Sequence, residues 1–258
     1  MTLPASFLKS LEGIQGFSRE AFELVHQSGE QVTSVRLNPA KTEGVLPPEF
    51  VSQVDAIPWA RLGYYLRQRP SFTFDPLFHA GNYYVQEASS MFLEQAMIQL
   101  TQETAPVKVL DLCASPGGKS THLQSLLPAG SLLVSNEVIR SRAAVLRDNI
   151  VKWGAEQVVV TNNDPKDFSG LESFFDVLVV DAPCSGSGLF RRDPEAIGEW
   201  SLNNVQLCSQ RQQRILADCW PALKENGYSF FLPVPTPGRK MRKSWIGYNR
   251  NWMQRIVR

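Results

Sequence analysis

The sequence predicts an α/β fold, in which a Rossmann-like parallel sheet follows a small α+β module. From residue 108 onwards, short and nearly continuous apolar segments alternate with segments of helical periodicity. This alternation is typical of a parallel sheet with helices on both faces. Consecutive right-handed crossovers make such a sheet doubly wound. Residues 1–80, by contrast, hold seven of the 17 prolines and little regular periodicity.

Five short apolar segments are predicted to form the parallel sheet, because each one ends at polar residues, glycine or proline. These segments are Lys108–Cys113, Ser131–Ser135, Gln157–Thr161, Phe175–Val180 and Tyr228–Leu232. Helical spacing of apolar residues predicts three helices between them. The helices are Lys119–Leu127, Arg140–Trp153 and Asn203–Lys224. Gly154 ends the second helix, and Asn226-Gly227 is expected to end the third. In the first 80 residues we expect a helix over Ser18–Ser28 and a strand over Thr33–Leu37.

The elements divide the chain into three regions. Residues 1–80 are the small α+β module, residues 81–232 the Rossmann-like domain, and residues 233–258 a basic tail that we expect to be poorly ordered. Residues 227–258 carry seven Lys or Arg and no Asp or Glu, although the net charge of the whole chain is only +1. Such a tail is either a nucleic-acid-binding arm or a solvated segment.

Composition excludes several classes of protein. With 43% hydrophobic and 20% charged residues, the chain is neither collagen-like nor wholly disordered. No apolar run is long enough to cross a bilayer and the first residues lack a signal-peptide pattern, so we expect a cytoplasmic protein without a membrane partner. The four cysteines form no C-x-x-C pair, so neither a metal site nor a disulfide framework is expected.

The residues that follow the strands are the candidates for a site, because parallel sheets bind ligands at the carboxyl ends of their strands. Residues 116–118, Pro-Gly-Gly, let the backbone approach a ligand and lead into a helix N-terminus. Glu137 follows the second strand and can accept hydrogen bonds from ribose hydroxyls. Asp164 follows the third strand and Asp181 the fourth. Together these residues predict a nucleoside-binding site.

A phosphate-binding loop is the weaker alternative. Gly118-Lys119-Ser120 matches the end of the G-x-x-x-x-G-K-[ST] pattern. However, Cys113 stands where the pattern needs its leading glycine. We therefore rank a P-loop NTPase below an enzyme that binds a nucleoside cofactor.

Cys184 follows Asp181-Ala-Pro at the end of the fourth strand and precedes a loop rich in glycine and serine. A thiolate there can activate a pyrimidine, because its addition to C6 of cytosine makes C5 nucleophilic enough to accept a methyl group from a sulfonium donor. Loss of the C5 proton and elimination of the thiol then restore the base. Such covalent catalysis needs a thiolate at the wall of a pocket.

Four segments resemble the RNA cytosine-5 methyltransferases of the Nol/Nop/Sun family. They are Tyr83–Met91 (YYVQEASSM), Asp111–Lys119 (DLCASPGGK), Phe175–Gly188 (FDVLVVDAPCSGSG) and Arg191–Glu195 (RRDPE). The resemblance extends from about residue 34 to residue 227. It implies a Rossmann-like methyltransferase sheet, an N-terminal module of the RNA-binding type, and S-adenosylmethionine-dependent methyl transfer to C5 of a cytosine in rRNA or tRNA.

The resemblance also implies roles for single residues. The S-adenosylmethionine-binding residues would be Cys113, Ala114, Ser115, Pro116, Gly117, Gly118 and Lys119, with Glu137 on the ribose, Asp164 near the adenine and Asp181 at the cofactor or the target cytosine. The catalytic residues would be Cys184, Asp181 and Lys119. Gln86 and Glu87 would lie near the cofactor, and Arg191 and Arg192 would contact RNA phosphate.

The sequence departs from the family at one catalytic position. The family's nucleophile is the cysteine of a Thr-Cys motif at the end of the fifth strand, whereas its Pro-Cys cysteine, matched by Cys184, helps to release the product. Residues 229–238 read SFFLPVPTPG, and no cysteine follows Cys219. Cys208 and Cys219 lie within the predicted helix before the strand.

We therefore expect a truncated or frame-disrupted family member with impaired catalysis, whose fifth strand is an exposed sheet edge. Two alternatives remain open. Cys184 is itself the nucleophile, or the chain is a non-catalytic module that binds RNA or cofactor. Neither the particular RNA nor the oligomeric state follows from the sequence.

Overall fold

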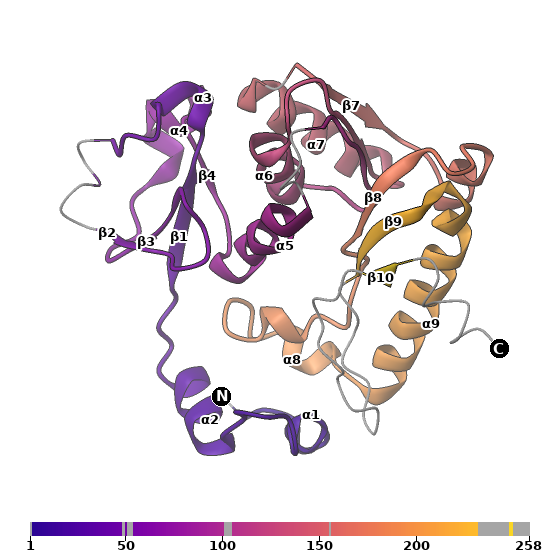
Figure 1. Cartoon of the computed structure of the whole chain (residues 1–258). Coiled ribbons are helices and arrows are strands. Elements are labelled where there is room, and N and C mark those ends of the chain that lie inside the picture. The colour runs from indigo at the N-terminus through magenta and orange to yellow at the C-terminus, as the bar shows by residue number, and fades with distance from the viewer. Residues whose placement is uncertain are drawn as a thin grey trace.

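Two β-sheets organise the chain, as Figure 1 shows. The structure is a computed structural model, and it describes residues 2–47, 50, 54–100, 105–154, 156–231 and 248–249. The predicted basic tail therefore lies almost wholly outside the described residues. None of the helices in the described residues is both long and apolar enough to cross a membrane.

The N-terminal sheet is antiparallel and has the strand order β2-β3-β1-β4. Its strands are β1 (Thr33–Leu37), β2 (Val54–Ala56), β3 (Gly63–Leu66) and β4 (Tyr83–Val85). The short helices α3 (Pro39–Thr42) and α4 (Pro76–Ala80) and a 3-10 turn (Phe72–Phe74) connect them. Because β4 pairs with the inner strand β1, this sheet extends beyond residue 80.

The second sheet has the strand order β10-β9-β8-β5-β6-β7. Its strands are β5 (Lys108–Asp111), β6 (Leu132–Asn136), β7 (Val158–Thr161), β8 (Phe175–Val180), β9 (Leu223–Phe231) and β10 (Tyr248–Asn249). Strands β5 to β9 run parallel to one another, whereas β10 pairs antiparallel with β9. The order confirms the predicted doubly wound α/β sheet, and the carboxyl ends of five strands share one edge.

Helices cover both faces of this sheet (Figure 1). They are α5 (Leu93–Leu100), α6 (Gly118–Leu126), α7 (Arg140–Trp153) and α9 (Leu202–Cys219). The short α8 (Ala196–Glu199) precedes α9 and packs in the cluster that contains residues of α1. Val109 and Val177 pack with residues of α5 and α6, whereas Leu110 and Leu178 pack with residues of α9. Successive strand residues face opposite layers, so the strands are apolar throughout.

The prediction for the approach to the fifth strand was wrong. Helix α9 ends at Cys219, a 3-10 turn over Trp220–Ala222 follows, and β9 already begins at Leu223. Asn226-Gly227 therefore lies inside the strand, where the pairing with β8 shifts register. A Cβ at Gly227 would lie 2.9 Å from the backbone oxygen of Asp176, so the irregular strand needs glycine there.

The prediction that the fifth strand is an exposed edge was also wrong. Strand β10 pairs antiparallel with it, Tyr248 opposite Ser229 and Asn249 opposite Tyr228. This pairing covers part of a backbone edge that would otherwise present free donors and acceptors.

The first two helices, α1 (Ala5–Leu11) and α2 (Arg19–Gln27), belong with the second sheet's domain and not with the first sheet. Phe7 of α1 makes edge contacts with the rings of Phe190 and Trp200, at 5.1 and 5.4 Å between centroids. Phe190 and Trp200 lie in the segment between β8 and α9. The start of the chain therefore supports the loop that carries Cys184.

We expect Phe190→Ala to lower the free energy of unfolding by about 3–5 kcal/mol, because it removes a fully buried ring from this cluster. Urea unfolding of the whole chain measures the change. Phe74→Ala is the matched control, since that ring is 85% exposed and its removal should change stability by no more than about 0.5 kcal/mol. Equal effects of the two substitutions would contradict the proposed support.

Candidate functional site

The loop between β5 and α6 carries the predicted residues Cys113 to Lys119, and hydrogen bonds hold it on both sides. The amide of Ala114 donates to the carbonyl of Asn136, at the end of β6. Ser115 and Arg142 bond reciprocally through Ser115 Oγ to the Arg142 carbonyl (3.0 Å) and Arg142 Nη2 to the Ser115 carbonyl (3.1 Å). Gly117 has a φ of +110°, a backbone conformation that favours glycine. These contacts hold the loop in one conformation, and α6 begins at its end, at Gly118.

A cavity of about 180 Å³ opens beside this loop. Its wall comes from the loop, from Asp181 directly after β8 and from the segment around the end of β4. The lining residues are Tyr84, Val85, Gln86, Glu87, Ser90, Cys113, Ala114, Ser115, Pro116, Gly118, Lys119 and Asp181. The structure thus brings the predicted residues of the glycine loop together with Asp181 and with Gln86 and Glu87.

Lys119 and Asp181 form an ion pair at the cavity wall. Lys119 Nζ lies 2.5 Å from Asp181 Oδ2, and both side chains are partly shielded from solvent. Lys119 stands in the first turn of α6 and Asp181 directly follows β8, so the pair joins two neighbouring strand ends. The contact holds one carboxylate in position beside the cavity and balances its charge.

Asp111, at the end of β5, is a further buried carboxyl behind this pair. Its Oδ2 accepts a hydrogen bond from Ser120 Oγ at 2.7 Å, and its Oδ1 has no partner in the described part of the chain. Burial raises the pKa of Asp111 to about 6, while Ser120 and Lys119 act in the opposite direction. Asp111 was not among the predicted site residues, although it begins the segment that carries the glycine loop, and this position was the available signal.

Glu137 and Asp164 lie outside the lining of the cavity. Glu137 Oε1 accepts a hydrogen bond from the Ile139 amide at 3.0 Å, and Oε2 lies 3.5 Å from Arg142 Nη2. Asp164 caps a 3-10 turn by accepting from the Lys166 amide at 3.1 Å. Both residues follow strands of the same sheet, β6 and β7, and so extend the candidate site along the shared strand-end edge.

Asn136 connects three of these strand ends, although it was not among the predicted site residues. Its Nδ2 donates to the carbonyls of Leu112 (3.1 Å) and Asn163 (3.0 Å). Its Oδ1 accepts from the Asn163 amide (2.9 Å) and from Thr161 Oγ1 (2.8 Å). Asn136 is completely buried, so this amide uses its donors and acceptors to hold the loops after β5, β6 and β7 together.

The four cysteines differ sharply in their surroundings. Burial raises the pKa of Cys113 and of Cys219 to about 12, so both remain thiols at neutral pH. Cys208 is half-buried in α9. Cys184 is exposed on the loop after β8, three residues beyond Asp181, and is not among the residues that line the cavity.

The two arginines that were predicted to contact phosphate have different environments. Arg191 Nη2 donates to the carbonyl of Glu30 at 2.6 Å, which ties the loop after β8 to the segment after α2. The side chain of Arg192 is exposed. Arg192 therefore has more freedom than Arg191 to meet a ligand at the surface.

Within the part of the chain that the structure describes, no group of three or more His, Cys, Asp or Glu side chains could hold a metal ion.

Two protein families match the chain. The family described as 16S rRNA methyltransferase RsmB/F matches residues 97–232, and the family described as the N-terminal domain of 16S rRNA methyltransferase RsmF matches residues 3–88. Among curated relatives, the ribosomal RNA small subunit methyltransferase F of Pectobacterium atrosepticum is 31% identical over 242 residues, which cover 89% of this chain and 49% of the relative. That of Aeromonas salmonicida is 33% identical, over 87% of this chain and 49% of the relative. The chain thus spans about half the length of the curated relatives it matches.

Solved structures share the fold. A methyltransferase homolog protein from Pyrococcus horikoshii has a TM-score of 0.64 at 25% identity, over 88% of this chain and 76% of that chain. NSun6 from Pyrococcus horikoshii, solved with SFG, has a TM-score of 0.69 at 14% identity, over 87% of this chain and 80% of that chain. At the latter identity the likeness concerns the fold alone.

We expect the raised pKa of Asp111 to make stability depend on pH. The unfolded chain loses the proton near pH 4 and the folded chain near pH 6, so the folded state binds the proton more tightly. The resulting stabilisation is present below pH 4 and is lost as the pH rises through about 6. Between pH 4 and pH 7, the stability of the unmodified chain relative to Asp111→Asn should fall by about 2–3 kcal/mol in urea unfolding.

Asp55→Asn is the control for this measurement. Asp55 is exposed, and its hydrogen bond with Arg67 lowers the pKa of its carboxyl, so its dependence on pH should have the opposite sign. A stability difference for Asp111→Asn that stays constant from pH 4 to pH 7 would show that folding does not raise the pKa of Asp111.

Proposed function

Because the chain belongs to the RsmB/F family of 16S rRNA methyltransferases, we propose that it binds S-adenosylmethionine and transfers the methyl group to C5 of a cytosine in RNA. The observation that carries the proposal is the cavity in which the loop from Cys113 to Lys119 meets Asp181. The names of the curated relatives favour small-subunit rRNA over tRNA as the substrate.

The residues around the cavity suit a nucleoside cofactor. A Cβ at Gly118 would lie 3.4 Å from the Tyr84 ring, so glycine keeps this part of the cavity open. Glu137 retains lone pairs for ribose hydroxyls, since each of its oxygens has only one contact in the described residues. Asp164 would lie towards the adenine, one strand further along the edge. When bound, S-adenosylmethionine supplies an electrophilic methyl group on its sulfonium.

Lys119 and Asp181 are the residues best positioned to act near the reacting groups. The ion pair fixes the Asp181 carboxylate at the cavity wall, where it would accept hydrogen bonds from the cofactor or from the amino group of a cytosine. Lys119 contributes a positive charge to the same wall and limits the repulsion between Asp181 and the buried Asp111. We therefore assign both residues to the orientation of the reactants.

Cys184 is the candidate for the thiol chemistry. Among the described cysteines it is the exposed one, whereas the thiols of Cys113 and Cys219 are held in the protonated form by burial. In the family that the sequence resembles, the cysteine matched by Cys184 helps to release the product, and a second cysteine adds to C6 of the cytosine. This sequence has no Thr-Cys motif after β9. We therefore propose that methyl transfer by this chain is slower than in relatives with both cysteines.

The test of cofactor binding is calorimetry with S-adenosylhomocysteine. We expect Gly118→Val to weaken binding at least about tenfold, because the added side chain meets Tyr84 and Gln86 at the cavity wall. Gly198→Ala is the matched control, since no atom lies within 4 Å of the added Cβ and its backbone needs no positive φ. Absence of binding to the unmodified chain would refute the proposed function.

A second test concerns Cys184. The alternative in which Cys184 is itself the nucleophile is favoured by its exposure, and it predicts a covalent adduct with RNA that contains 5-fluorocytosine. Such an adduct should form with the unmodified chain and with Cys208→Ser, but not with Cys184→Ser. With no adduct in any of the three, this alternative is eliminated, and cofactor binding without turnover then favours a non-catalytic module.

A further inference from the structure

Arg36 places a charged group in the interior, between the two sheets. It lies in β1 and is 2% exposed, and no acidic side chain of the described residues forms an ion pair with it. Its guanidinium carbon lies 4.5 Å from the centre of the Trp153 ring. Burial lowers the pKa of Arg36 to about 9. The charge of Glu94 acts in the opposite direction, but a buried cation that forms no ion pair is costly unless hydrogen bonds satisfy its donors.

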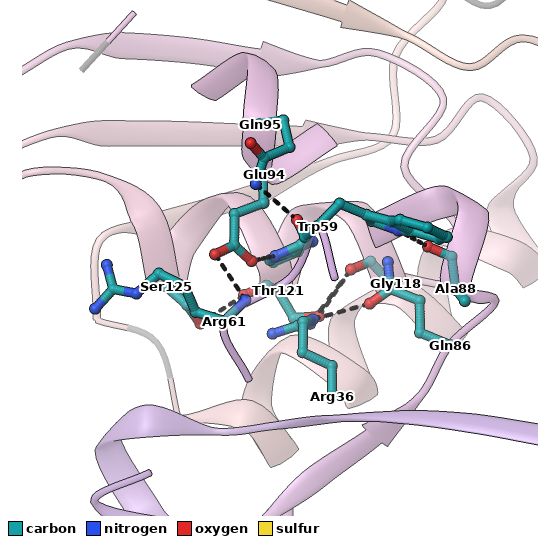
Figure 2. A network of polar contacts seen from close by, with 11 residues as sticks. Arg36, Trp59, Arg61, Gln86, Ala88, Glu94, Gln95, Gly118, Thr121 and Ser125 are labelled. Atoms are coloured by element: carbon teal, nitrogen blue, oxygen red, sulfur yellow. Dashed lines mark hydrogen bonds and ion pairs between the residues drawn. The ribbon is translucent and has the colours of Figure 1, made fainter. Parts of the chain in front are cut away.

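The guanidinium binds three groups around the start of α6, as the dashed lines in Figure 2 show. Nη2 donates to Thr121 Oγ1 at 2.7 Å and to the Gly118 carbonyl at 3.4 Å. Nε donates to Gln86 Oε1 at 2.9 Å. Arg36 thus connects β1, the residue after β4 and the first turn of α6.

The contact with Gln86 determines which way its amide faces. A guanidinium has only donors, so the amide atom that meets Arg36 must be the oxygen. The amide nitrogen, Nε2, must then point away from Arg36. Gln86 is 7% exposed and lines the cavity, yet its Nε2 is buried and has no hydrogen-bond partner in the described part of the chain. An oriented donor without a partner calls for an acceptor.

The position of this donor points to one end of the ligand. Glu137 and Asp164, the candidates for ribose and adenine, lie outside the cavity, so the cavity itself would take the opposite, amino-acid end. A Cβ at Gly118 would lie 3.7 Å from Gln86 Nε2, so this donor lies beside the N-terminus of the nine-residue helix α6. A helix N-terminus and a side-chain amide donor both favour an anion.

We infer that Gln86 Nε2 donates a hydrogen bond to the carboxylate of the amino-acid end of S-adenosylmethionine, and that Arg36 is a positioning residue that orients this amide. The inference rests on the proposed function, because it assumes S-adenosylmethionine as the ligand of the cavity. It gives the N-terminal sheet a defined part in cofactor recognition, since Arg36 lies in β1 and Gln86 directly follows β4.

The decisive substitution is Gln86→Glu. A glutamate can still accept the hydrogen bond from Arg36, so the buried network keeps its shape, but it presents an anion where the amide presented a donor. We expect the Kd for S-adenosylmethionine to rise about 10- to 100-fold, because the variant loses a hydrogen bond to a charged group. Decarboxylated S-adenosylmethionine lacks only the carboxylate, so its Kd should change less than about twofold or should fall.

The controls separate ligand recognition from structure. Gln95→Glu makes the same exchange at an amide that donates to the Trp59 carbonyl outside the cavity, and it should leave the ratio of the two Kd values unchanged. Arg36→Lys keeps the charge but loses the planar fork that orients the amide. Arg36→Lys should therefore weaken the binding of S-adenosylmethionine more than the binding of the decarboxylated ligand. Binding of the decarboxylated ligand shows that each variant is folded.

The outcomes are distinguishable. If Gln86→Glu weakens the binding of both ligands equally, or of neither, the inference is overturned and the proposed function still stands. An unmodified chain that binds neither ligand would overturn both.

Discussion

The site depends on the way in which one buried guanidinium joins the two sheets. Arg36, on the inner strand β1 of the N-terminal sheet, donates hydrogen bonds to the first turn of α6 and to Gln86 beside it. Both sheets contribute to the wall of the cavity, with Tyr84 to Glu87 on one side and the loop from Cys113 to Lys119 on the other. Neither sheet alone forms this cavity. Recognition of a ligand there is therefore inseparable from the contact between the sheets, and a change within β1 acts on the site without touching the ligand.

A second constraint orders the remainder of the site. Parallel strands bring their carboxyl ends to one edge, and the buried amide of Asn136 fastens the loops after β5, β6 and β7 to one another. The hydrogen bonds between the Asn136 side chain and the backbone thus fix the spacing of the Cys113–Lys119 loop, Glu137 and Asp164, and they need no ligand to form. Such preorganisation reduces the conformational entropy that the loops lose when a ligand binds.

Strand periodicity and strand-end chemistry were sufficient to predict the parallel sheet, helix α7 to the residue, and the meeting of Asp181 with the glycine loop. Non-local contacts account for what was missed. Arg36 looks like an ordinary polar residue in a strand, because the partners that bury it lie 50 and 85 residues further along the chain. The start of β9 at Leu223 depends on a register shift against β8, with Lys224 paired to Asp176 at 2.5 Å. Neither pairing has a signal in local sequence.

The arrangement of strands also separates cofactor binding from turnover. The residues assigned to the cofactor follow β5, β6, β7 and β8, whereas the family's nucleophile would follow β9, on the far side of β8 from β5. The sequence after β9 lacks a cysteine, but the loops that would bind the cofactor are held by contacts among themselves, through Asn136, Lys119 and Asp181. A change confined to the chain after β9 therefore leaves the cavity wall intact. It follows that loss of the second thiol would lower the rate of the chemical step while it leaves the affinity for the cofactor largely unchanged.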